Sequence, residues 1–77
     1  MRIIDTIEHP ILRISIFEMN QKYIVKFELG ALEQSFKFSE LDIINLEILK
    51  ADVAEKIIPN ALFRFEEMQN DLNNCLG

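Results

Sequence analysis

The sequence predicts an α+β fold, in which a three- or four-stranded antiparallel β-meander is followed by two C-terminal helices packed on one face of the sheet. Apolar residues alternate with polar ones up to Ser39 and recur every three to four positions after it. The pair Gly30-Ala31 indicates a tight hairpin, and Pro59 divides the helical half in two. At 77 residues, we expect residues 1–77 to form a single small domain.

The Gly30-Ala31 hairpin fixes the register of two strands. Glycine suits the first central position of a type II′ turn, because it adopts that backbone conformation without strain. The turn pairs Leu29 with Leu32, and one face of the hairpin becomes almost wholly apolar. That face carries Tyr23, Val25, Phe27 and Leu29 opposite Phe38, Phe36, Gln34 and Leu32.

The preceding hairpin follows the same logic. A polar turn at Asn20-Gln21 pairs Met19 with Lys22 and sets Arg13 opposite Glu28, where opposite charges are mildly stabilising. The apolar face of this strand carries Leu12, Ile14 and Ile16, beside Val25 and Phe27.

Residues 2–7 supply the optional fourth strand, at the edge of the sheet. Glu8-His9-Pro10 would then form the turn and place Asp5 beside Arg13. A bulge near Pro10 would shift this register, so the three-stranded alternative stays open.

Two caps compete for the start of the first helix. Ser39 with Asp42 has the pattern of a capping box, while Asn45 is an alternative cap, so the helix begins between Glu40 and Leu46. Pro59 ends this helix and suits the first turn of the next. The predicted stripes are Leu46, Leu49, Val53 and Ile57, then Ala61 or Leu62, Phe65, Met68, Leu72 and Leu76.

Charge is distributed unevenly and limits the classes of partner. Thirteen acidic and eight basic residues give a net charge of −5, and residues 39–77 carry all of it. Without a basic stripe, we expect no nucleic-acid partner and no binding to anionic membranes. A basic protein partner remains open.

Cysteine count and the N-terminal sequence indicate a soluble cytoplasmic protein. A single cysteine cannot form an internal disulfide. Asp5, Glu8 and Arg13 interrupt every apolar run that could form a signal peptide, and no stretch reaches the length of a membrane-spanning helix.

The residue inventory argues against an enzyme. The soft metal ligands His9 and Cys75 lie at opposite ends of the chain, so we expect no metal site, and a His9–Cys75 catalytic dyad is a minor alternative. Gly30 already serves the hairpin, so no glycine-rich loop remains for a phosphate. We therefore expect no catalytic residues, no cofactor and no small-molecule substrate.

Apolar residues outside the predicted core point to protein–protein interaction. Phe17 pairs with Ile24 on the outer sheet face, Ile11 with Ile3 and Ile7 could extend that patch, and Phe63 lies away from the Phe65 stripe. The alternative is that these residues enter the core. The sequence favours a non-enzymatic interaction module, homodimeric or bound to another protein through Phe17, Ile24, Ile11 and Phe63. A second hypothesis is an acidic inhibitor, or antitoxin-like antagonist, that covers a basic site on its partner.

Overall fold

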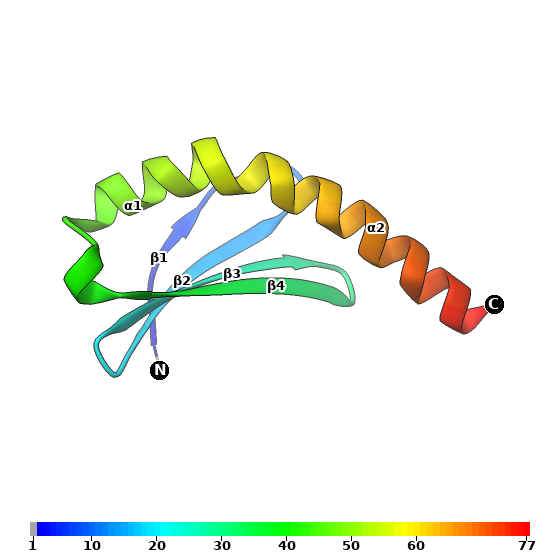
Figure 1. The fold of residues 1–77 in the computed structure, drawn as a ribbon, viewed down its shortest axis with the longest axis horizontal. Helices are drawn as coiled ribbons and strands as arrows, with labels where there is room; N and C mark the ends of the chain where they lie inside the picture. Colours follow the sequence, from blue (N-terminus) through cyan, green and yellow to red (C-terminus); the bar gives the residue numbers. More distant parts are fainter. Residues whose placement is uncertain (1) are drawn as a thin grey trace.

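Four consecutive strands form one antiparallel sheet in the computed structural model, which describes residues 2–77 (Figure 1). The sheet order β1-β2-β3-β4 follows the chain, so the predicted meander is confirmed in its four-stranded form. The strands are β1 (Arg2–Ile7), β2 (Arg13–Met19), β3 (Lys22–Leu29) and β4 (Leu32–Ser39).

Both predicted hairpin registers are confirmed. Leu29 pairs with Leu32, and Gly30 has a φ of 58°, as a type II′ turn requires. Met19 pairs with Lys22 across a turn in which Asn20 and Gln21 have φ values of 51° and 62°. Two consecutive positive φ values are the mark of a type I′ turn, whose twist matches that of the flanking strands.

The predicted register of β1 is wrong. Asp5 pairs with Ile16 instead of lying beside Arg13, and Ile7 pairs with Ile14 on the inner face instead of joining an outer patch. A bulge in β1 between Ile3 and Asp5 shifts the register, and the connection between β1 and β2 is longer than the expected three-residue turn.

His9 explains the longer connection. Its Nδ1 accepts hydrogen bonds from the backbone N–H groups of Ile11 and Leu12, both at 3.1 Å. These bonds hold the chain in a loop that continues to Leu12, so β2 begins at Arg13. The imidazole therefore has a structural role in this loop.

The helical half is one bent rod instead of two separate helices (Figure 1). After the 3₁₀ turn η1 (Glu40–Asp42), helix α1 (Leu46–Asp52) runs through the π-helical turn η2 (Val53–Ile57) into α2 (Ile58–Leu76). Pro59 lacks an N–H and would leave a carbonyl of a regular α-helix without its donor. The wider π turn ends two residues before Pro59, and the helix continues through it with a bend.

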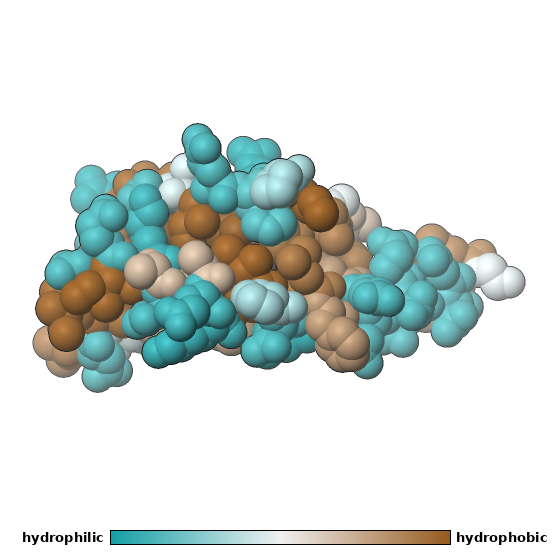
Figure 2. Space-filling model, turned by 90° about the horizontal axis from the view of Figure 1, so that it is seen from above, coloured by the Kyte–Doolittle hydropathy of each residue, from teal (hydrophilic) through white to brown (hydrophobic). Residues whose placement is uncertain are grey.

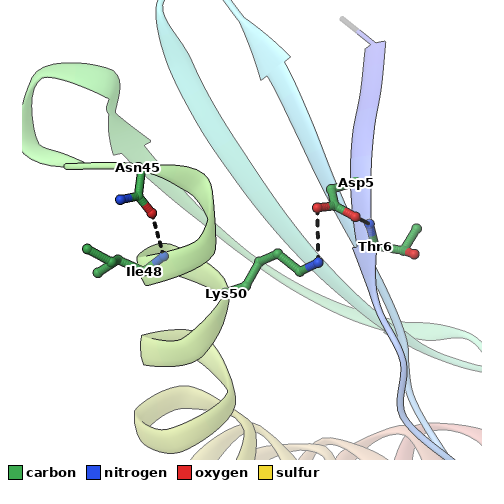
Figure 3. A network of polar contacts seen from close by, with 5 residues as sticks. All are labelled: Asp5, Thr6, Asn45, Ile48 and Lys50. Atoms are coloured by element: carbon green, nitrogen blue, oxygen red, sulfur yellow. Dashed lines mark hydrogen bonds and ion pairs between the residues drawn. The ribbon is translucent and has the colours of Figure 1, made fainter.

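Both candidate caps are used, each by a different element. The Ser39 hydroxyl accepts a hydrogen bond from the Leu41 N–H at 3.3 Å and caps η1. The Asn45 side chain accepts from the Ile48 N–H at 2.9 Å and caps α1 (Figure 3). The two capping signals therefore mark two consecutive helix starts.

The core lies between the rod and the two central strands. Its buried members are Leu12, Ile14, Ile16, Val25, Phe27, Leu49, Val53, Ile58, Ala61 and Phe65. Inner-face residues of the edge strands, such as Ile4 on β1 and Phe36 on β4, are only half-buried. A single rod thus covers the middle of the sheet's inner face, while no helix within residues 2–77 lies over the opposite, outer face (Figure 1).

Candidate interaction surfaces

The structure does not bring the four predicted interface residues together. Phe17 is half-buried on the outer sheet face, and its partner Ile24 is only 8% exposed. Ile11 is 62% exposed in the loop between β1 and β2. Phe63 is 63% exposed on α2, which lies on the other side of the sheet from Phe17 (Figure 1). The surfaces must therefore be considered separately.

The outer face of the sheet has an apolar centre beneath long basic side chains. Lys26 reaches over the Phe17 ring, with its Nζ 6.0 Å from the ring centroid, and also pairs with Glu33 at 3.4 Å. Because no helix covers this face, we attribute the burial of Ile24 to such stems, which cover apolar surface while their charged ends stay in water. The charges on this face sum to +2, from Arg13, Lys22, Lys26 and Lys37 against Glu28 and Glu33.

The end of α2 extends beyond the sheet. We call residues 66–76 the projection, because α2 runs past the Gly30 turn and none of these residues is buried (Figure 1). Its apolar residues Met68, Leu72 and Leu76 continue the stripe that Ala61 and Phe65 bury in the core. Leu76 is 78% exposed.

The projection is also acidic. It contains Glu66, Glu67 and Asp71 and no basic residue, which gives a formal charge of −3. At helical spacing, Glu66 and Asp71 lie on opposite sides of the apolar stripe. In Figure 2 this end of the molecule is mostly hydrophilic, with apolar atoms along one side.

A second apolar patch lies at the other end of the long axis. Leu41 is 96% exposed, Ile44 is 84% exposed and Ile48 is 42% exposed. These residues belong to η1, the following loop and the start of α1, where Figure 2 shows a hydrophobic surface. Sequence reasoning missed this patch, although Leu41 and Ile44 lie outside every stripe that the 3.6-residue period predicts.

An ion pair fastens α1 to the edge strand. Lys50 Nζ lies 3.0 Å from Asp5 Oδ2, and the Thr6 N–H donates to the other carboxylate oxygen at 2.8 Å (Figure 3). The hydrogen bond from Lys50 is the main cause of a lowered pKa at Asp5, and the same bond raises the pKa of Lys50. The bulge in β1 permits this contact because it brings Asp5 to the inner face.

Two carboxyl groups meet where β4 ends. A hydrogen bond with Glu18 and, secondarily, burial raise the pKa of Glu40. Arg2 pairs with Glu18 at 3.2 Å, and the Glu40 N–H donates to the Gln21 carbonyl at 3.0 Å. Strand register could have revealed this pair, since Glu18, Tyr23 and Phe38 share one row across the sheet, close to Glu40.

The residues weighed for chemistry stay apart. His9 lies in the loop between β1 and β2, beside an open depression of about 650 Å³, whereas the exposed Cys75 lies in the last turn of α2 (Figure 1). Over residues 2–77, no three His, Cys, Asp or Glu side chains are grouped so as to hold a metal ion. In the same range, no helix combines the length and apolar character needed to cross a membrane.

Comparisons with protein-family models, with curated proteins and with solved structures give no match to this chain.

Proposed function

We propose that this chain is a small, non-enzymatic protein-interaction module that works as a homodimer. The observation that supports it best is the apolar stripe of α2, which continues into the projection after the sheet has ended. In the core-facing part of α2, Ala61 and Phe65 are at most 1% exposed, whereas Leu76 in the projection is 78% exposed. A stripe without a surface to cover it is typical of an interface.

The physics of helix formation supports the same proposal. Most of the stability of a helix in a protein comes from packing of its apolar face, and short unpacked helices are marginal in water. The projection has about three turns and no buried residue. A partner that covers Leu72 and Leu76 would stabilise this segment as well as bury its stripe.

The test is the oligomeric state of the full chain across a range of concentrations, measured by sedimentation velocity and native mass spectrometry. We expect a dimer that dissociates when Leu72→Asn and Leu76→Asn are combined. The matched control is Leu41→Asn, which changes another exposed leucine at the far end of the molecule and should leave the dimer intact. A wild-type chain that stays monomeric at every concentration would contradict homodimerisation, and loss of the dimer in the control alone would move the interface to the Leu41 patch.

A second candidate function rests on the charge of the projection. Three acidic residues and no base suit an inhibitor that covers a basic site on another protein. This function predicts that gentle recovery of the tagged chain from its host brings down one basic protein in fixed stoichiometry, and that high salt releases it. Recovery of the dimer alone, at low and high salt alike, would contradict the inhibitor hypothesis.

A further inference from the structure

We propose that the acidic projection of one copy docks on the basic outer sheet face of a second copy, and that the contact is reciprocal. The inference rests on the homodimer proposed above and specifies how its two surfaces meet. Three features of the structure support it: opposite charge, matching apolar surface and matching length.

The charges of the two surfaces are complementary. The projection carries −3, and the outer sheet face carries +2. Lys22 and Lys37 make no ion pair within residues 2–77, although Lys26 on the same face is paired with Glu33. Two projections packed against each other would bring like charges together, whereas a projection on the sheet face brings carboxylates to unpaired ammonium groups.

The apolar residues of the two surfaces also match. The stripe of Leu72 and Leu76 lies between flanking acids on the helix, while Phe17 and Ile24 lie between flanking lysines on the sheet. Because lysine stems are flexible, their ammonium groups can move to the helix carboxylates and uncover the rings and methyl groups beneath. Ile3, which pairs with Phe17 and is 54% exposed, would enlarge the apolar contact.

The lengths of the two surfaces agree. Eleven helical residues extend about 16 Å, and the five-residue path from Leu29 to Ile24 along β3 covers about 17 Å. The projection passes the Gly30 turn of its own sheet and would continue over the second copy's outer face. Its end would therefore lie near the Ile24–Lys37 pair of the second copy.

A two-fold axis makes the contact reciprocal. The stripe of the projection faces the same way as Phe65, toward the level of the sheet, and the outer face points in the opposite direction. Turning the second copy over by 180°, with the two Gly30 turns adjacent, places each projection over the other copy's outer face. Each sheet then has its own rod on one face and its partner's projection on the other, which is a closed, isologous dimer.

The test uses two complementary charge variants. The first combines Glu66→Lys with Asp71→Lys in the projection, and the second combines Lys22→Glu with Lys37→Glu on the sheet face; all four positions are exposed, and circular dichroism checks that each variant stays folded. Each variant alone repels its own copies at both contacts, so we expect its dimer Kd to rise by about tenfold or more. An equimolar mixture, with one variant isotopically labelled, restores both attractive contacts and should form a heterodimer of near wild-type affinity.

The matched control combines Glu47→Lys with Glu55→Lys, which makes the same charge change on exposed positions of the rod outside the projection. We expect this control to dimerise as the wild type does. Wild-type dimerisation by both charge variants would overturn the reciprocal docking and leave the homodimer standing, as would a mixture that fails to form the heterodimer. A wild-type chain that never dimerises would overturn both proposals.

Discussion

Residues 46–65 and residues 66–76 belong to the same helical rod and share the same apolar spacing, but they differ in what lies beneath them. The first segment buries Leu49, Val53, Ile58, Ala61 and Phe65 against β2 and β3, whereas the second has no buried residue and only Met68, partly buried, packs against this core. The difference shows that an apolar stripe is core or contact surface according to where the sheet ends. Three predictions test how strongly the packed residues 46–65 differ from residues 66–76.

The largest effect is expected from truncating the packed stripe. Phe65→Ala removes a ring that is 1% exposed, which should cost about 3–5 kcal/mol of unfolding free energy. A domain of this size has about that much stability in total, so the variant should be largely unfolded. Chemical denaturation followed by circular dichroism measures the loss.

Phe63→Ala is the matched control for this prediction. Its ring is 63% exposed two residues away on the same helix, so the free energy of unfolding should change by only about 0.5 kcal/mol. Equal losses in both variants would contradict the division of the rod into packed and uncovered surfaces.

Hydrogen exchange should resolve the two segments within one molecule. In dilute solution, where the chain is monomeric, we expect amides of residues 46–65 to be protected about 100-fold or more above those of residues 66–76, because the projection opens by local fraying. Raising the protein concentration should increase protection most in residues 66–76, through the proposed dimer. Uniform protection along the rod of the dilute monomer would show that the projection is held by contacts within its own chain.

A smaller effect is expected at the ion pair that fastens the packed segment to β1. The pKa of Asp5 is lowered on folding, so its contribution to stability is complete above the ordinary aspartate pKa, about 3.9, and is lost as the pH falls through the lowered value. Lys50→Met keeps the aliphatic stem and removes the charge, and it should lower the melting temperature at pH 7. As the pH falls below the ordinary aspartate pKa and through the lowered value, the deficit should shrink, because Asp5 is then increasingly protonated in the wild type as well.

Lys56→Met is the control for this pH dependence. Lys56 pairs with Asp52 on the exposed side of the rod at 3.7 Å, and solvent screens this pair. We expect little change in melting temperature at any pH. A Lys50→Met deficit that is the same at pH 7 and at pH 2 would show that packing of the stem, and not the ion pair, fastens the rod.

Local sequence signals predicted the central sheet well. The register of β2, β3 and β4 depends on two tight turns and on strict alternation, both of which are visible in a few consecutive residues. The register of β1 was wrong because a side chain, His9, takes two backbone donors and lengthens the loop. The division into two helices was only approximate, because α1 and α2 are joined through the π turn and Pro59 does not end the helix.

The interaction surfaces were less predictable, because they depend on relative lengths in three dimensions. The sequence placed Phe63 outside the stripe, and it is exposed. Ile24 was expected to lie exposed on the outer sheet face. Strand alternation alone does not show how far the aliphatic stems of neighbouring basic side chains cover it. The projection could not be recognised, since Leu72 and Leu76 have the same spacing whether or not a sheet lies beneath them.

The π turn also preserves the rotational phase of the rod. The buried Val53 is the first residue of the turn and the buried Ile58 follows the turn, five residues later, and both are directed at the sheet. In a regular α-helix, five residues advance about 140° beyond one full turn, whereas four residues advance only about 40° beyond it. Removing one residue from the turn would therefore restore a regular helix and leave both apolar stripes directed at the sheet. The π turn thus holds one extra residue in front of Pro59 without changing the direction of the stripe beyond it.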